Sequence, residues 1–175
     1  GDLIRIGDEI RTLQNTIERE ERDGESSTID AAPIIERVVD RYQRANPQAT
    51  IRATHPDELY VTGDSMLQRA LADVIENALE HSDKPDPTVT VSVEPDCTPP
   101  RSAASDDAVA ADWLGIRVAD DGPGIPDYER RLINGDEEIT PLKHGSGLGL
   151  WVVSWITESF GGDVTIETSE PRGSV

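Results

Sequence analysis

The sequence predicts an α/β two-layer sandwich, in which a mixed β-sheet is covered on one face by helices and is preceded by a coiled-coil helix. Three observations predict this class. Segments with the alternating pattern of strands are interspersed with segments of helical periodicity. Strands and helices that follow one another in this way form two packed layers. At 175 residues, the chain suits one domain of ordinary size plus an appendage, with a core that needs no disulfides.

The appendage is the N-terminal segment. Its apolar residues recur at spacings of 3, 4, 3 and 4, which is the narrow seam of a coiled coil: Leu3, Ile6, Ile10, Leu13 and Ile17. The spacing predicts a coiled-coil helix over residues 1–24 that pairs with another helix, so we expect a homodimer. The alternative is a helix docked on its own domain, which would occupy residues 25–175.

The first half of this domain shows a strand, a helix and two further strands. Residues 27–30 form the first strand, and a helix with Pro33 in its first turn follows. Residues 49–53 and 59–62 are expected to pair with each other around a turn at Pro56.

A long helix and two strands come next. Residues 63–65 supply an N-cap for a helix over residues 66–81. Residues 88–94 and 113–119 alternate as strands. Between them, residues 95–112 are rich in Pro, Ser, Ala and Asp, and they predict a flexible insert.

The C-terminal part contains a polar stretch and an apolar helix. Residues 125–144 are polar and weakly periodic, whereas residues 147–160 form a helix that is apolar nearly all round. Gly161 and Gly162 end this helix before an expected strand over residues 163–168.

The charge excludes several classes of protein. With 35 acidic and 16 basic residues, the net charge is −19, which argues against nucleic acid as a partner. The well-spaced Val, Ile and Leu residues exclude a disordered acidic tail. An acidic coat of this kind is typical of proteins from extreme halophiles, because molar salt shortens the Debye length to about 3 Å and screens the repulsion.

Other features bound the setting of the chain. Cys97 is the single cysteine and lies among Pro and Ser, so we interpret it as an incidental loop thiol. No apolar run approaches the roughly 20 residues needed to cross a bilayer, so we expect no direct membrane contact and a cytoplasmic location. The start at Gly1 rather than Met predicts a piece of a longer protein, which is free to have a membrane anchor elsewhere.

Two polar side chains border the buried face of the helix over residues 66–81. Asp73 and Asn77 lie one turn apart, beside an apolar arc. Oxygen ligands from one or two side chains, completed by phosphates and water, hold magnesium in phosphoryl-transfer sites. This pair is therefore our candidate for catalysis and metal binding, and the alternative is a solvated helix edge.

A second motif follows the strand over residues 113–119. Asp120 is placed at the strand end, where Gly122 and Gly124 permit a tight turn with close backbone approach. A buried carboxylate there can accept a hydrogen bond from the amino group of adenine, which guanine lacks at that position, so we expect ATP to be preferred over GTP. The alternative is an ordinary hairpin turn, which Pro123 disfavours.

A third motif opens the apolar helix. Gly145, Gly147 and Gly149 let backbone amides converge on phosphate oxygens at a helix N-terminus. Neither the Rossmann spacing nor the P-loop pattern with its Lys is present. Residues 125–146 then become a lid over the nucleotide.

These three motifs, in this order, resemble the N, G1 and G2 boxes of the GHKL (Bergerat) ATP-binding fold, and within it the catalytic domain of sensor histidine kinases, here of haloarchaeal type. The resemblance covers residues from about 27 to 175. It implies ATP and Mg²⁺ as cofactors, with Asn77 as the metal ligand, joined by Asp73. The implied nucleotide-binding residues are Asn77, His81, Asp120, Gly122, Gly124, Ile125, Lys143, His144, Gly145, Ser146, Gly147, Leu148 and Gly149.

The resemblance also implies a function. The γ-phosphoryl group of ATP would pass to a His on a dimerisation domain and then to a response regulator. His55, His81 and His144 lack the setting of an acceptor, so the acceptor is expected outside this chain. Two departures from the family are Glu80, where a basic residue is frequent, and the missing Phe-rich box.

Two alternatives stay open. One is another GHKL enzyme, either an ATP hydrolase with Asp73 as base or an anti-sigma-type Ser kinase, because hydrolysing relatives carry Glu at this position where kinases more often carry Asn. The other is a degenerate module that binds ATP or dimerises without transferring phosphate.

Overall fold

A computed structural model gives the structure of the protein and describes residues 27–95, 97, 113–134, 148–168 and 173–174. The predicted coiled-coil helix and most of the predicted insert lie outside the described residues. In chain order the elements are β1 (Ser27–Asp30), α2 (Ala32–Ala45), β2 (Thr50–Thr54), β3 (Tyr60–Gly63), α3 (Met66–Glu80), β4 (Thr88–Glu94), β5 (Gly115–Asp120), α4 (Asp127–Ile133) and α5 (Leu148–Ser159).

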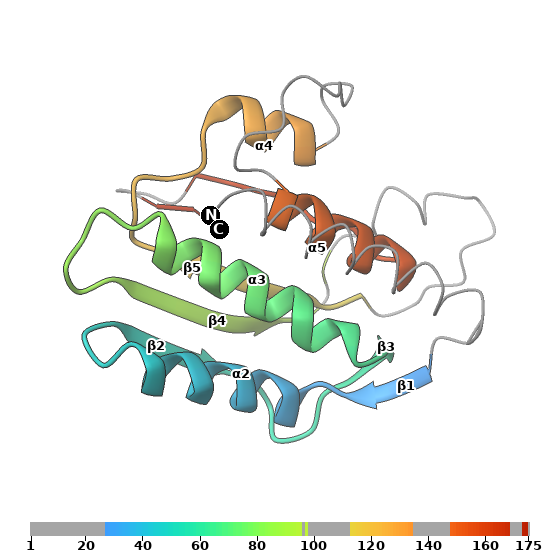
Figure 1. The fold of residues 1–175 in the computed structure, drawn as a ribbon. Coiled ribbons are helices and arrows are strands. Elements are labelled where there is room, and N and C mark those ends of the chain that lie inside the picture. The colour runs from blue at the N-terminus through green and yellow to red at the C-terminus, as the bar shows by residue number, and fades with distance from the viewer. Residues whose placement is uncertain (1–26, 96, 98–112, 135–147, 169–172, 175) are drawn as a thin grey trace.

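The elements form a sheet layer and a helix layer, as predicted. In the larger sheet, β4 is central, with β2 parallel on one side and β5 antiparallel on the other. Strands β1 and β3 form a separate antiparallel pair. Figure 1 shows α2, α3 and α5 lying roughly side by side over the sheet, and contacts join α2 to β2 and to α3, and α3 to β4, β5 and α5.

The alternating pattern of β4 explains its central place. Val89 and Val91 are almost completely buried beneath α2 and α3, while Thr88, Thr90 and Ser92 alternate with them. Burying an aliphatic side chain of this size contributes about 1.5–3 kcal/mol. A second apolar cluster joins α3 to α5 through Ala70, Val152, Val153 and Ile156. Helix α3 is thus packed on both flanks, which fixes the residues along its border.

The expected pairing of residues 49–53 with residues 59–62 is wrong. Strand β2 pairs instead with β4 across the α3 crossover, and β3 pairs with β1. The reason lies in Asp30, whose carboxylate accepts hydrogen bonds from the amides of Ala32 and Leu59, each at 3.1 Å. Ala31 also donates its amide to the Leu59 carbonyl at 2.7 Å. These bonds hold the start of β3 against the junction of β1 and α2, away from β2.

The expected strand over residues 163–168 is also not observed, apart from an isolated bridge between Thr168 and Ser174. Instead, the backbone amide and carbonyl of Ile166 both form hydrogen bonds with the Asn134 side chain. Its amide donates to the Ile166 carbonyl at 3.1 Å, and its oxygen accepts from the Ile166 amide at 2.8 Å. The Asn134 side chain thereby satisfies the backbone groups of Ile166 that a neighbouring strand would otherwise pair with.

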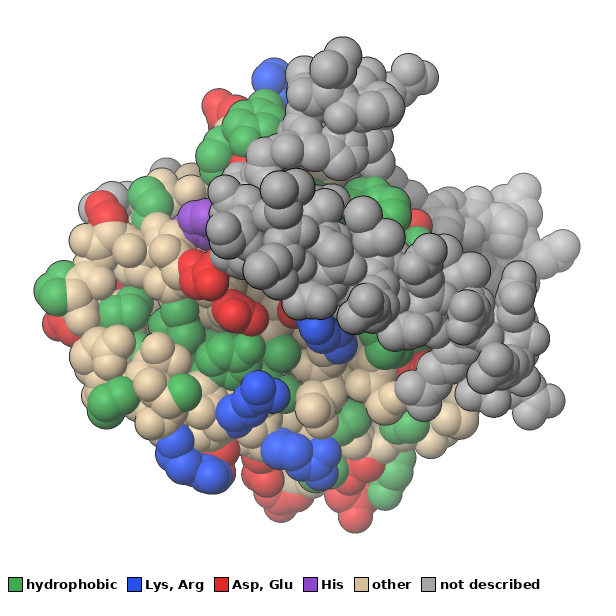
Figure 2. All heavy atoms as spheres, in the orientation of Figure 1, with side chains coloured by type: hydrophobic (Ala, Val, Ile, Leu, Met, Phe, Trp, Pro, Cys, Tyr) green, Lys and Arg blue, Asp and Glu red, His purple; other side chains and the backbone are tan. Residues whose placement is uncertain are grey.

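Charges are unevenly distributed over the helices. Figure 2 shows basic side chains gathered on the face formed by α2 and α3, although the chain as a whole is acidic. Arg37, Arg41 and Arg44 are exposed on α2, and Arg44 pairs with Asp40 at 3.0 Å. Among the described residues, no helix is both long and apolar enough to span a membrane.

Candidate functional site

Helix α3 positions the first part of the site. Its first turn is capped by Asp64, whose carboxylate accepts the Met66 amide at 2.5 Å, within the segment predicted to supply the cap. Leu71 and Ile75 face the core and are almost fully buried. This orientation places Asn77 at the border of the buried face, where its side chain is half-buried.

The turn over residues 120–124, hereafter the G1-like turn, follows β5 and forms the second part of the site. Strand β5 ends at Asp120, and the Gly122 amide donates to Asp120 Oδ1 at 2.7 Å. A Cβ on Gly122 would lie only 2.9 Å from that same oxygen, so a larger residue there would displace the Asp120 carboxylate. Gly124 has a φ of +86°, in the left-handed region that glycine adopts without strain. The predicted tight turn is therefore present, and it folds back onto its own carboxylate.

A third segment, which the sequence did not point to, completes the wall. The Asp120 amide donates to the Ser174 carbonyl at 3.0 Å, and the Ser174 amide donates to Asp120 Oδ2 at 3.2 Å. Gly173 has a φ of +118°, and a Cβ there would overlap the Asp120 carbonyl oxygen. In the sequence, the signal available for this contact was the dipeptide Gly173-Ser174.

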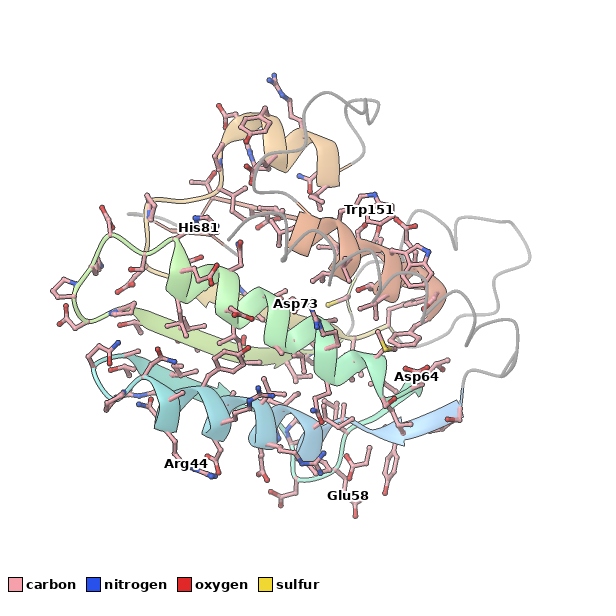
Figure 3. The ribbon with its side chains drawn as sticks, in the orientation of Figure 1. Arg44, Glu58, Asp64, Asp73, His81 and Trp151 are labelled. Carbon is pink, nitrogen blue, oxygen red and sulfur yellow. The ribbon has the colours of Figure 1, made fainter. Side chains whose placement is uncertain are left out.

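The end of α3, the G1-like turn and Ser174 together line a small pocket that is open to solvent. It contains five of the predicted residues together with three others, and its lining is Asn77, Ala78, His81, Asp120, Pro123, Gly124, Ile125 and Ser174. Figure 3 shows His81 at the end of α3, and His81 is one of the residues that line the pocket. The amide of His81 caps the helix by donating to the Asn77 carbonyl at 3.1 Å. The structure thus places two of the three predicted motifs in one pocket.

Two backbone amides hold the carboxylate of Asp120 in this pocket. Burial raises its pKa above the ordinary value, while the hydrogen bonds from Gly122 and Ser174 act in the opposite direction. The two amides use one site on each oxygen and the Ser174 hydroxyl uses a third, whereas an ionised carboxylate offers about four lone-pair sites. Asp120 therefore keeps acceptor capacity for a donor that enters the pocket.

Asp73 is oriented differently from its predicted partner Asn77. Its carboxylate accepts a hydrogen bond from Arg69 Nε at 2.8 Å, one turn back along α3, and only 9% of its side chain is exposed. Burial raises the pKa of Asp73, and the pairing with Arg69 works against this shift. Asp73 does not line the pocket.

The donor set fits a metal that is held mainly by a nucleotide. Asn77 offers one amide oxygen to the pocket. Within the described part of the chain, no group of three His, Cys, Asp or Glu side chains is arranged to hold a metal ion. Magnesium needs only one or two protein oxygens when phosphates and water supply the others. The residues present are thus compatible with a magnesium-nucleotide.

The third predicted motif lies mostly outside the described residues, which applies to Lys143, His144, Gly145, Ser146 and Gly147. Leu148 begins α5, and Gly149 lies in its first turn with open space where a Cβ would be. Within the predicted lid, residues Asp127–Ile133 form the helix α4, which contacts α5. The role of this motif in nucleotide binding stays a prediction.

Comparison with known proteins gives the site a family context. Residues 63–175 match the family described as histidine kinase-, DNA gyrase B-, and HSP90-like ATPase. The sensor protein IrlS of Burkholderia pseudomallei is 33% identical over 151 residues, which cover 83% of this chain and 29% of IrlS. The histidine kinase SenX3 of Mycobacterium tuberculosis is 28% identical over 182 residues, which cover 99% of this chain and 40% of SenX3. The chain therefore spans less than half the length of these relatives.

Solved structures show the same fold. The mycobacterial sensor histidine kinase MprB superimposes with a TM-score of 0.61 at 27% identity, covering 85% of this chain and 92% of that structure. The catalytic domain of the histidine kinase ThkA also gives 0.61, at 19% identity, covering 85% of this chain and 90% of that structure. The observed α/β architecture with a mixed sheet agrees with both.

Proposed function

Because the chain belongs to the family of histidine kinase-, DNA gyrase B- and HSP90-like ATPases, we propose that it is the catalytic part of a two-component sensor histidine kinase. The expected resemblance is confirmed for family and fold, and ATP binding follows from the family. In the proposed reaction, the γ-phosphoryl group of Mg-ATP passes to a His on a dimerisation domain. A response regulator then receives the group.

Asp120 carries this proposal. The Gly122 and Ser174 amides hold its carboxylate in the pocket wall, and lone pairs remain for the amino group of adenine. Asn77 lines the same pocket, so a nucleotide with its base at Asp120 can extend its phosphates toward Asn77. Bound magnesium would neutralise phosphate charge, which leaves positioning as the main task of the protein.

The rival reading as an ATP hydrolase is less well supported. It requires Asp73 to act as a base for water near the phosphates. The Asp73 carboxylate is instead paired with Arg69 at 2.8 Å and lies outside the pocket lining. A base must lie within hydrogen-bond reach of the proton that it removes, directly or through one water. We therefore place Asp73 in a supporting role beside Asn77.

The proposed partners follow from the same reading. Residues 1–24 would form the second helix of a dimerisation hairpin and join two copies of the parent protein. The receiver domain of a response regulator would act on the phosphorylated hairpin. The cytoplasm is the proposed location of this segment, whether or not its parent is anchored in a membrane.

Single-turnover phosphorylation tests the proposal. The chain is mixed with γ-labelled ATP, magnesium and a separately supplied dimerisation hairpin that carries an acceptor His. We expect acid-labile label on the hairpin and none on the chain itself. Asn77→Ala is the matched control and should transfer little label. Stable label on this chain alone, or release of free phosphate at the same rate without the hairpin, would contradict the proposal.

A further inference from the structure

Asp121 follows the pocket residue Asp120 directly, but its side chain serves a different purpose. It does not line the pocket. Asp121 Oδ1 accepts the backbone amide of Thr88 at 3.0 Å, and Oδ2 pairs with Lys84 Nζ at 3.0 Å. Both partners belong to the stretch of chain that runs from the end of α3 to the first residue of β4.

This connecting segment lies against the G1-like turn. A Cβ on Gly122 would come within 3.7 Å of Ser82 Cα, so the backbones of the turn and the segment are neighbours. The Ser82 hydroxyl accepts the Lys84 amide at 3.2 Å, which orders the segment locally. Asp121 contacts both the middle of the segment, at Lys84, and its end, at Thr88.

We propose that Asp121 is a positioning residue for the nucleotide pocket. Together with Lys84 and Thr88 it forms a clasp, hereafter the Asp121 clasp, that fixes the G1-like turn against the segment following α3. One wall of the pocket carries Asp120 and the other carries Asn77 and His81. The clasp therefore sets the separation of the adenine-binding carboxylate from the residues placed near the phosphates. Its effect on nucleotides rests on the function proposed above.

The two bonds of the clasp differ in strength. The Thr88 amide is a fixed backbone donor to a charged acceptor, which is among the stronger classes of protein hydrogen bond. Lys84 and Asp121 are 36% and 33% exposed, so their ion pair is screened by solvent and contributes little by itself. Burial acts to raise the pKa of Asp121, but the donors outweigh it and lower the pKa. The carboxylate thus stays ionised where the clasp needs an acceptor.

A set of three variants separates positioning from charge. Asp121→Ala removes both bonds, Asp121→Asn keeps an oxygen for the Thr88 amide but loses the charge, and Lys84→Gln removes only the ion pair. Asp121→Ser is a second variant that removes both bonds, because its side chain is too short to reach Thr88. It keeps a polar group at this half-exposed position, so it disturbs the fold less than Asp121→Ala. If the clasp acts mainly through Thr88, the Asn variant should rescue what the Ala and Ser variants lose.

Amide hydrogen exchange reads the clasp without any nucleotide. The amides of Gly122 and Ser174 both donate to Asp120 and both residues are buried, so their protection reports how firmly the carboxylate is held. We expect Asp121→Ala and Asp121→Ser to lower protection of these two amides about tenfold. The Val91 amide in β4, a reporter of the packed core, should keep its protection. Asp121→Asn and Lys84→Gln should stay within about threefold of the parent chain.

Titration with ATP then tests the consequence for the pocket. Affinity should fall about tenfold in the Ala and Ser variants and stay within about threefold in the Asn and Lys84→Gln variants. Unchanged protection of Gly122 and Ser174 in both the Ala and Ser variants would overturn the clasp. Equal losses in the Asn and Ala variants would overturn the role assigned to the Thr88 bond. If the Ala and Ser variants lose protection as expected but the parent chain binds no ATP, the clasp is supported and the proposed function is refuted.

Discussion

Replacing Asp120 with Ala tests the adenine assignment most directly. The carboxylate accepts two backbone amides, at 2.7 Å and 3.2 Å, and is left with capacity for the amino group of adenine. Losing a charge-assisted hydrogen bond to that group should cost about 1.5–3 kcal/mol, or roughly ten- to a hundredfold in ATP affinity. GTP presents an oxo group there and has no such bond to lose. The preference for ATP over GTP should therefore nearly disappear.

Isothermal titration calorimetry with both nucleotides measures this preference. The variant also loses its bonds to Gly122 and Ser174, so the apo domain should be less stable by about 1–3 kcal/mol, and titrations belong well below its melting temperature. Undiminished ATP affinity would remove the adenine assignment. An equal loss for ATP and GTP would also refute it, since that result would indicate a distorted pocket rather than a lost contact with the base.

The pH dependence of the same contact has a definite sign. Burial raises the pKa of Asp120 in the folded chain, so its contribution to stability is present below the ordinary carboxyl pKa and is lost as pH rises through the raised value. Binding behaves in the opposite way, because the ionised form is the better acceptor. ATP affinity should thus decline as pH falls through the raised pKa. Asp120→Asn should lack this component, while titration of the ATP phosphates affects both proteins equally.

Three further predictions concern the metal, the third segment and the charge. Asn77→Ala should weaken magnesium-dependent nucleotide binding and leave the apo melting temperature nearly unchanged; an apo loss above about 2 kcal/mol would indicate a core role. Gly173→Ala should lower the free energy of unfolding by about 1–3 kcal/mol, because a φ of +118° is strained for Ala. It should also lower ATP affinity, because the new Cβ would displace the Asp120 backbone. Differential scanning fluorimetry would detect the first effect and calorimetry the second, and unchanged stability and affinity would contradict the observed contact. With a net charge of −19, the melting temperature should climb as potassium chloride rises from about 0.1 M to about 2 M, and a flat profile would refute the halophile interpretation.

Local patterns predicted the elements better than their partners. The alternation in residues 88–94 and the periodicity of α3 were sufficient to locate both, because burial on one face imposes a period. Strand pairing failed for β2 and β3, which are close in sequence and therefore suggested a hairpin. Their true partners are determined by contacts between distant residues, such as Asp30 with Leu59. Such contacts leave no periodic trace in the sequence.

The site was predictable where a motif dictates backbone geometry. The Asp-x-Gly-x-Gly pattern located Asp120, Gly124 and the turn correctly, since only glycine fits a φ of +86° without strain. The contact with Ser174 was missed because it joins positions 54 residues apart. The Arg69–Asp73 pair at i and i+4 was visible in the sequence and went unused, although it decides which way Asp73 points.

Asp120 and Asp121 show how neighbouring carboxylates acquire different tasks. Donors from the protein satisfy Asp121 and lower its pKa, so it has little to gain from a ligand. Asp120 is half-buried, has a raised pKa and keeps acceptor capacity that its donors from Gly122 and Ser174 do not use. A buried charge that is only partly satisfied gains the most from a new donor, because burial has already removed its water. In this dipeptide Asp121 is thus the proposed structural anchor and Asp120 the proposed recognition group, because Asp121 is bonded to Lys84 and Thr88 whereas Asp120 lines the pocket.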